Sequence, residues 1–309
     1  MFDVCVELGL DPITFRRNNF QQAGQTTHYG QTLTSGDVTM DQCMDRVIEN
    51  SNYYQTKREV ETFNQSHSYK KRGVYLNPNK YGIGIPEAFA FQGALVNIYC
   101  DGSVLVSHGG VEVGQGLHTK MVQLVSHELA IPLNRVHISE SANDKVPNPM
   151  YTGGSSAADL NGNALIDACR QLNERLRPLK EQNSALAWEE IISLAFDTKV
   201  NLSAAGFYSG PAKQATFSAA TKAGRRWWYY TTGASCSLVE IDVLTGEHSL
   251  LATEIVMDIG DALNPAIDVA NIEAAFIQET FRYHLINITD LCFKKKLIDF
   301  QCFGSMCDV

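Results

Sequence analysis

The sequence predicts an α+β protein in which a β-hairpin, a glycine-containing loop and a helix follow one another more than once. Apolar residues alternate on both sides of a turn at Asp101-Gly102, which is a strong short-range hairpin signal. A glycine cluster at 109–116 comes next, and apolar residues at helical spacing follow it from Leu117 to Leu129. The same order returns between Cys236 and Phe276, so the fold class is predicted to be α+β with repeated hairpin–glycine loop–helix modules.

Composition limits the class of protein. The chain has 309 residues, of which 44% are hydrophobic and 19% charged, as expected for a soluble globular protein. A net charge of −9 argues against nucleic-acid binding, and no apolar run approaches the roughly 20 residues of a membrane span. The eight cysteines form no C-x-x-C pair, and no basic leader opens the chain. We therefore expect reduced, buried thiols in a cytoplasmic protein.

The N-terminal part of the sequence predicts short helices followed by a strand. Two helices are expected within residues 1–20 around a turn at Gly9 to Pro12, where Asp11 caps the second helix. Two more are expected between Asp41 and Glu61, with a break near Asn50 to Tyr53. A strand-rich stretch then runs from Gly73 to Tyr81.

The rest of the sequence alternates strands and helices. A long helix follows a second glycine-containing loop and is expected to end at Pro178, because proline interrupts helical hydrogen bonding. A second hairpin turns at Thr245-Gly246, and a helix capped by Asn264 begins at Pro265. Further expected elements are a strand at 136–139, a helix at 188–196, a strand after Asn201, an exposed loop at 213–226, a strand from Trp227, and an inward face of the last helix formed by Ile267, Ile272, Ala275 and Phe276.

Two glycine-containing loops precede predicted helices and are the candidate ligand site. Gln115 lies between two glycines, so its amide and the backbone N–H groups beside it suit an anion at a helix start. The second loop opens at Thr152, and Ser155 and Ser156 add hydroxyl groups. Two such loops about 40 residues apart favour one polyanionic ligand held between two helix starts. The alternative is a hairpin and a tight loop without a ligand, since glycine spacing alone is a weak signal.

Other polar residues near these loops have structural interpretations. His108 and His118 flank the first loop without a zinc-ligand spacing, so both are expected to be structural. Glu112 lies in the loop and is given no role as a base. Asp258 and Asp261 are expected to be turn residues.

Several segments together resemble a known family. They are DGSVLVSHGGVEVGQGLHTKM at 101–121, SAADLNG at 156–162, VEIDVLTG at 239–246, NPAID at 264–268 and EAAFIQ at 273–278. Over roughly residues 3 to 281 the chain resembles the second molybdenum-cofactor-binding domain of the xanthine dehydrogenase/aldehyde oxidase family. The Gly153-Gly154 pair, and the lack of an aromatic–Thr pair after Gly82, are more similar to an aldehyde oxidase.

The resemblance implies a cofactor and a set of contact residues. A molybdopterin is expected to insert water-derived oxygen into aldehydes or electron-poor N-heterocycles, in a family whose members form homodimers. The cofactor would contact the two glycine-containing loops and the helix that follows the second hairpin. The residues assigned by the resemblance are Val113, Gly114, Gln115, Gly154, Ser155, Ser156, Ala157 and Gln278.

The chain also departs from the family pattern. The family's 2Fe-2S domains, FAD domain and first molybdenum domain have no counterpart in the sequence, and neither does its C-terminal catalytic Glu, so no catalytic residue is assigned. We expect a mostly helical part at 1–72, a molybdopterin-binding part at 73–281 and an unrelated, disordered or loosely helical tail at 282–309. The leading hypothesis is a molybdenum hydroxylase fragment that is inactive alone. The alternatives are a non-catalytic dimerisation partner of a full-length homologue and a gene-model fragment.

Overall fold

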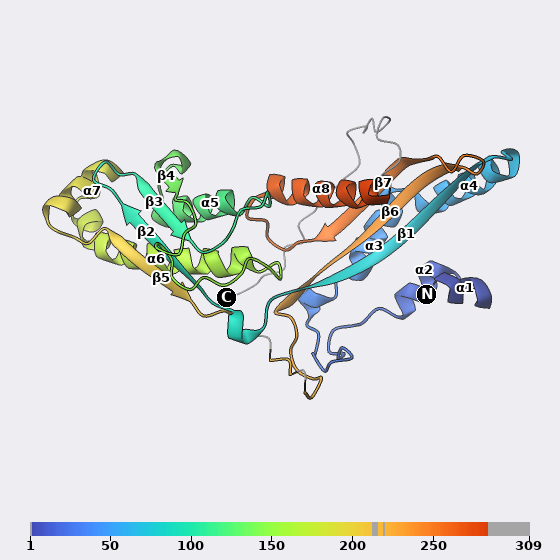
Figure 1. The fold of residues 1–309 in the computed structure, drawn as a ribbon, viewed down its shortest axis with the longest axis horizontal. Coiled ribbons are helices and arrows are strands. Elements are labelled where there is room, and N and C mark those ends of the chain that lie inside the picture. Colours follow the sequence, from blue (N-terminus) through green and yellow to red (C-terminus); the bar gives the residue numbers. More distant parts are fainter. Residues whose placement is uncertain (1, 212–215, 219, 284–309) are drawn as a thin grey trace. The chain divides into compact units, whose positions relative to one another are not determined.

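The computed structural model describes residues 2–211, 216–218 and 220–283, and Figure 1 shows their ribbon. The described residues divide into two compact units: a terminal unit within residues 1–82 and 229–283, and a central unit within residues 83–228. Helices and sheets occur in both, which confirms the predicted α+β class. The domain boundaries expected at residues 72 and 281 come from segments of the sequence and not from the packing of the two units. They stay a prediction.

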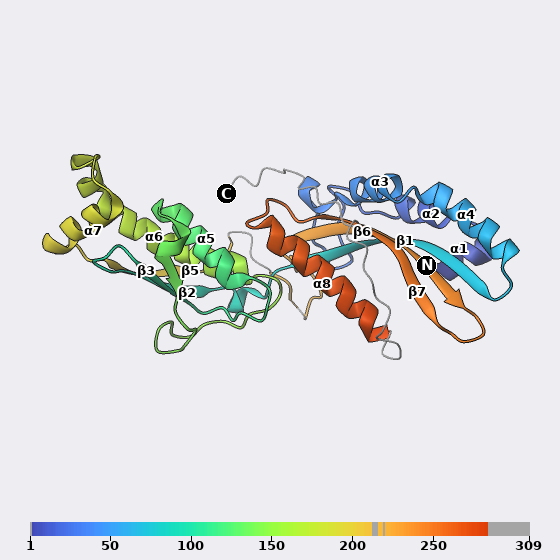
Figure 2. The ribbon, with the colours of Figure 1, turned by 90° about the horizontal axis from the view of Figure 1, so that it is seen from above.

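The terminal unit is a three-stranded sheet with helices α1 to α4 on one side, whereas α8 lies on the other, as Figure 2 shows from above. The strand order is β1-β6-β7, and α3 packs on β6 and β7. Apolar side chains of α2, α3 and the three strands form its core. The elements are α1 Phe2–Leu8, α2 Pro12–Asn18, α3 Met40–Asn50, α4 Tyr53–Ser66, β1 Lys70–Ile83, β6 Tyr229–Asp242, β7 His248–Asp258 and α8 Pro265–Tyr283.

The central unit is a four-stranded sheet covered by α5 and α6. The order is β4-β3-β2-β5, in which β2 pairs antiparallel with both β3 and β5, whereas β4 pairs parallel with β3. Its elements are β2 Gln92–Ile98, β3 Val104–His108, α5 Leu117–Leu129, β4 Val136–Ile138, α6 Ala157–Gln182, α7 Trp188–Asp197 and β5 Ser203–Tyr208. Short 3-10 turns lie at Ser35–Asp37, Glu87–Phe89 and Leu133–Arg135.

Most of the predicted elements and caps are present. Asp11 accepts the Thr14 N–H at 2.8 Å, and Asn264 accepts the Ile267 N–H at 3.1 Å, so both predicted caps are confirmed. The hairpin–loop–helix order occurs in β2, β3 and α5 and again in β6, β7 and α8. Within the described residues, no helix combines the length and the apolar character that a bilayer crossing requires.

Two predictions about these elements are wrong. Helix α6 continues past Pro178, because this proline lies on the exposed side of the helix and the buried Leu172 and Leu176 hold the preceding turns on the core. Cys100 is exposed, because it lies in the turn between β2 and β3, although the other four described cysteines are buried. Cys292, Cys302, Cys307 and the tail from residue 284 lie outside the described residues, as do 212–215 and 219 of the loop at 213–226.

The predicted inward face of the last helix is also wrong. Ala275 of α8 is exposed, and Ile267, Ile272 and Phe276 are only partly buried. Hydrophobic spacing identifies one face of a helix, but it does not identify a surface that covers this face.

Helix α6 approaches β5 closely enough to hydrogen-bond along its free edge. A Cβ on Gly206 would lie 2.7 Å from the backbone nitrogen of Ala168, so only glycine permits this packing. Three α6 side chains spaced four residues apart then satisfy outward-facing backbone groups of β5. Asp167 accepts the Phe207 N–H at 3.0 Å, Gln171 donates to Ala205 O at 3.0 Å, and Arg175 donates to Ser203 O at 2.7 Å and Asn201 O at 3.1 Å. This row closes the edge against pairing with another strand.

We predict that Arg175→Ala lowers the free energy of unfolding by about 1–3 kcal/mol, because two backbone carbonyls lose a charged donor. Urea unfolding followed by circular dichroism measures the change. Arg170→Ala is the matched control on the same helix, and it should change stability by less than about 0.5 kcal/mol. Equal losses in both variants would show that the carbonyl contacts of Arg175 do not stabilise the edge.

Candidate functional site

The two glycine-containing loops meet in the central unit. We call residues 109–116 the Gly-Gln-Gly loop and residues 152–156 the Gly-Gly-Ser loop. The N–H of Val111 donates to Oγ1 of Thr152 at 2.9 Å, which joins the two loops directly. The Gly-Gln-Gly loop ends at the start of α5 and the Gly-Gly-Ser loop at the start of α6. Their expected proximity is therefore confirmed, and Thr152 is a linking residue that the sequence interpretation did not identify.

Side chains of the Gly-Gln-Gly loop close it on itself. The Gln115 amide donates to Val111 O at 2.7 Å, and its carbonyl accepts the Val113 N–H at 2.6 Å. Gln115 thus spans the turn instead of pointing freely from it. Val113 is 79% exposed at the tip, and a Cβ on Gly114 would meet no atom within 4 Å.

Glu112 fills the position where the sequence suggested an external anion. Its Oε1 accepts the N–H groups of Gly114 at 2.8 Å and Gly116 at 3.0 Å, and its Oε2 accepts that of His118 at 2.9 Å. Partial burial raises the pKa of Glu112, but these three bonds outweigh it and the net shift is downward. The expectation of open N–H groups at this helix start is therefore wrong, because the chain supplies its own carboxylate.

The start of α6 is different, because no side chain caps it. In the described structure, the backbone N–H groups of Gly154, Ser155, Ala157 and Ala158 have no protein acceptor. Ser155 is exposed, whereas Ser156 is buried and its hydroxyl donates to Gly153 O at 2.9 Å. Of the two serines assigned by resemblance, only Ser155 is exposed.

Gly154 has a packing role that the sequence did not reveal. Its carbonyl accepts the Gly84 N–H at 3.0 Å, its φ is +62°, and a Cβ would lie 2.7 Å from Gly84 O and against Ile85. A side chain at this position would therefore strain the fold itself, in addition to blocking any contact with a ligand. Ala157 begins α6, and Gln278 is an exposed residue of α8 in the terminal unit.

The buried His108 and the half-buried His118 lie behind the Gly-Gln-Gly loop. The Gly110 N–H donates to Nδ1 of His108 at 3.1 Å, so the proton of His108 must be on Nε2. That nitrogen lies 3.0 Å from Nδ1 of His118 and donates to it. Burial, followed by the neighbouring His118, lowers the pKa of His108 from 6.5 to about 4. The neutral His108 ring thus links the loop backbone at Gly110 to His118.

Buried amides also surround the first glycines of this loop. Oε1 of Gln92 and Oδ1 of Asn161 accept no hydrogen bond within the described residues, although both side chains are buried. A Cβ on Gly109 would lie 2.7 Å from the Gln92 oxygen, and one on Gly110 would lie 2.9 Å from the Asn161 nitrogen. Both glycines are therefore required by neighbouring side chains, a reason that spacing in the sequence does not show.

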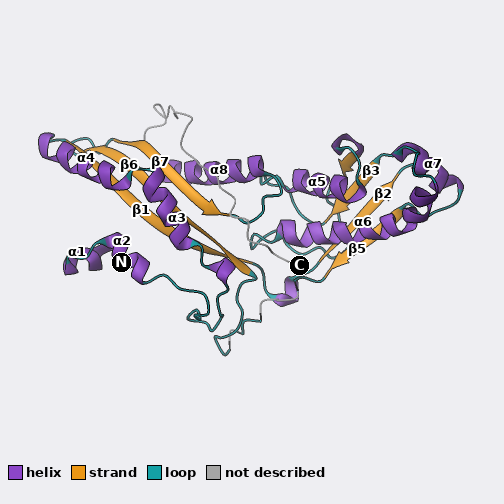
Figure 3. Cartoon of the chain, turned by 180° about the vertical axis from the view of Figure 1, so that it is seen from behind, coloured by secondary structure: helices purple, strands orange, loops and turns teal. Residues whose placement is uncertain are grey.

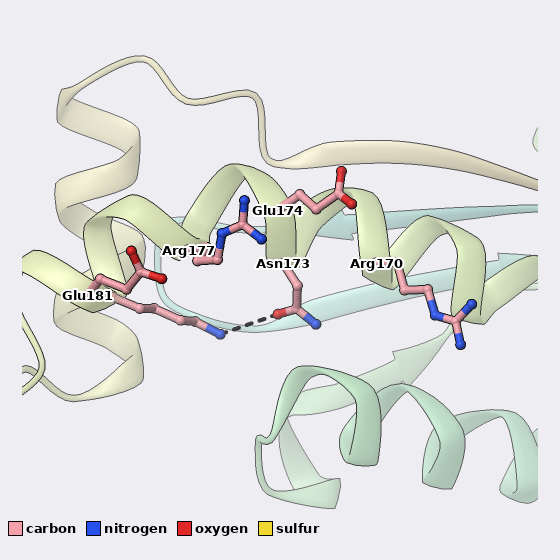
Figure 4. A pocket seen from close by; sticks show the side chains of 6 residues that line it. Arg170, Asn173, Glu174, Arg177 and Glu181 are labelled. Atoms are coloured by element: carbon pink, nitrogen blue, oxygen red, sulfur yellow. Dashed lines mark hydrogen bonds between the residues drawn. The ribbon is translucent and has the colours of Figure 1, made fainter.

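A separate hollow of about 500 Å³ lies against the C-terminal half of α6 (Figure 4). Its lining begins about 20 Å along the helix from the Gly-Gly-Ser loop. Cations and carboxylates are mixed there, and Lys180 donates to Asn173 at 3.3 Å. The lining residues are Arg170, Asn173, Glu174, Arg177, Lys180 and Glu181. This open, mixed-charge surface is not part of the loop site.

Comparison with known proteins gives concordant matches. The model of the Molybdopterin cofactor-binding domain matches residues 46–279. Xanthine dehydrogenase of Calliphora vicina is 49% identical over 278 residues, which are 89% of this chain and 20% of the relative. Xanthine dehydrogenase/oxidase of Mus musculus is 46% identical over 279 residues, which are 90% of this chain and 21% of the relative. The chain thus spans about a fifth of the length of these curated relatives.

Solved structures share the fold. The aldehyde oxidoreductase from Desulfovibrio desulfuricans superposes with a TM-score of 0.71 and 25% identity, over 86% of this chain and 28% of that one. The aldehyde oxidoreductase from Desulfovibrio gigas superposes with a TM-score of 0.72 and 21% identity, over 85% and 28% of the two chains. At 21% identity the second match shows the fold alone.

We predict that acid destabilises the chain through His108. Its folded pKa of about 4 lies below its ordinary value of 6.5, so the unfolded chain binds the proton first. Stability is complete above pH 6.5 and falls by about 3 kcal/mol as the pH drops to about 4. Urea unfolding across this range measures the slope.

The variant His108→Gln should flatten that slope, because it removes the titrating ring. His137→Gln is the control, since His137 is exposed on β4 and its loss should leave the slope unchanged. A slope that survives in His108→Gln would assign the acid sensitivity to other groups.

Proposed function

The chain belongs to the molybdopterin cofactor-binding domain family, and we propose from this premise that it holds the pterin cofactor of a molybdenum hydroxylase. The proposed contacts in the central unit are made by its two loops, and the resemblance separately assigns Gln278 of α8. Together they comprise Val113, Gly114, Gln115, Gly154, Ser155, Ser156, Ala157 and Gln278. When bound, the cofactor supplies the oxygen-transfer and redox chemistry, and the protein binds and orients it.

The observation that carries the proposal is the uncapped start of α6. Free N–H groups at the start of a 26-residue helix, together with the exposed Ser155, form a donor set that suits a phosphate. Glycine at 153 and 154 keeps this approach free of bulky side chains. The residues present therefore fit an anionic cofactor group, with the α6 start as its binding point.

The Gly-Gln-Gly loop contributes shape more than charge. Gln115 holds the turn between Val111 and Val113, and the open Gly114 leaves room for a flat ligand beside the backbone. Since the Gln115 amide already bonds within the loop, we propose that it orients the loop and meets the cofactor along the turn.

The activity of the whole protein is proposed from its relatives. The parent reaction would be oxidative hydroxylation of an aldehyde or N-heterocycle with oxygen derived from water. No catalytic residue is assigned in this chain, which spans about a fifth of the curated relatives. The aldehyde oxidase-like assignment, a homodimer and a cytoplasmic location stay predictions.

Molybdenum analysis tests the cofactor proposal. We predict that the purified chain, expressed with a molybdopterin supply, retains about one molybdenum per polypeptide, because the α6 start binds the cofactor. It should not oxidise an aromatic aldehyde with oxygen or a dye as acceptor. A chain without molybdenum would instead favour the alternative, a non-catalytic partner of a full-length homologue.

A substitution at the open glycine tests the place of binding. We predict that Gly114→Ala lowers molybdenum retention about tenfold, because a methyl group enters the space beside the turn. Gly246→Ala is the matched control: its φ is also positive, at +77° against +100°, and it too has no atom within 4 Å. Both variants carry the same kind of backbone strain, but Gly246 lies in the β6–β7 turn. Equal retention by both would place the cofactor elsewhere.

A further inference from the structure

Both helix starts at the site present backbone N–H groups, but only the start of α5 has a carboxylate bound to such groups. At α6 the described backbone N–H groups of the first turn remain without a capping side chain. At α5 the carboxylate of Glu112 accepts three N–H groups, two in the loop and one in the first turn of the helix. A carboxylate in this position also interacts favourably with the helix dipole. The α5 start therefore already holds an anion from its own chain.

The Glu112 carboxylate holds the turn together, and we call its three hydrogen bonds to the backbone the clamp. Its two oxygens reach the backbone at Gly114, Gly116 and His118, so they fix both ends of the turn that contains Gln115. Gly114 and Gly116 have positive φ values of +100° and +77°. Glycines have little conformational preference to hold such values without hydrogen-bonded partners. The loop would lose this geometry if the carboxylate were removed.

A second set of bonds depends on the first. The Gln115 side chain bonds to the backbone of Val111 and of Val113. Glu112 lies between these two residues in the sequence. Each side chain therefore holds the backbone that carries the other. Loss of the Glu112 contacts frees Gly116 and with it the position of Gln115.

We propose that Glu112 is the positioning residue of the cofactor loop, whose carboxylate takes the place of a ligand anion at α5 and holds the loop in its binding shape. The proposal rests on the function proposed above, and it deepens that function by assigning the two helix starts different tasks. The α5 start is closed by Glu112 and shapes the loop, whereas the α6 start receives the anionic group of the ligand. Glu112 acts through the backbone and transfers no proton.

Hydrogen exchange of the chain without cofactor tests the clamp. In Glu112→Gln the amide group keeps the size of the side chain, but its NH2 cannot accept the His118 N–H and the charge is lost. The amides of Gly114, Gly116 and His118 should exchange about tenfold faster or more. Exchange in Met121 to Leu129 of α5 should stay unchanged, which separates loop opening from unfolding.

Two further variants make the test specific. Glu140→Gln is the matched control, because Glu140 is exposed in the same unit and its recorded contact uses the backbone oxygen. Glu112→Asp keeps the charge with a shorter reach, so it should restore part of the protection that Glu112→Gln loses. No restoration by Asp would contradict a role for the negative charge, because Glu112→Gln already keeps the size of the side chain.

Molybdenum retention of the same variants then tests the link to binding. Glu112→Gln should retain about tenfold less molybdenum than the unsubstituted chain, and Glu112→Asp an intermediate amount. Unchanged exchange in Glu112→Gln, or faster exchange with unchanged molybdenum, would each overturn the proposal. If the unsubstituted chain holds no molybdenum, the proposed function and the positioning role both fail, while the exchange result still decides whether the clamp exists.

Discussion

The contact between the backbone of α6 and Gly206 of β5 is the packing constraint on which the central unit depends. A Cβ at Gly206 would lie 2.7 Å from the Ala168 nitrogen, and the small residues Ala164 and Ala168 complete the approach. Figure 3 shows α6 lying along the sheet at this contact. With the helix held there, its side chains reach the free edge of β5, and its first turn is carried to the Gly-Gly-Ser loop. The position of the candidate site is thus set by packing distant from it.

The sequence predicts elements well where one local cause determines them. Asp11 and Asn264 cap helices because an acceptor three residues before an N–H is a local feature. The inward face of α8 and the helix end at Pro178 fail for the opposite reason. Each depends on what lies beside the helix. The face of α8 is buried only if another surface covers it, and α6 continues past the exposed Pro178 because its opposite face is held in the core.

The same distinction applies to the site. Glycine spacing identifies both loops, and the motifs identify the family, because backbone freedom and residue order are visible in the sequence. Glu112 was set aside since no base role follows from its position, and its three backbone contacts exist only once the turn has formed. Gly154 was assigned only as a cofactor contact, but it also packs on Gly84 and Ile85, which lie about 70 residues earlier in the chain. Such long-range neighbours cannot be read from local pattern.

A glycine-rich loop before a helix is therefore not evidence of an anion site until its N–H groups are accounted for. Backbone donors at a helix start must find acceptors, and a nearby side chain, water or a ligand can each supply them. In this chain a carboxylate accepts N–H groups at one start and no side chain caps the neighbouring one, although both follow glycine-containing loops. The asymmetry has a physical use. A loop that satisfies its own donors keeps its shape without a ligand, and the uncapped start beside it keeps the donors that a ligand needs.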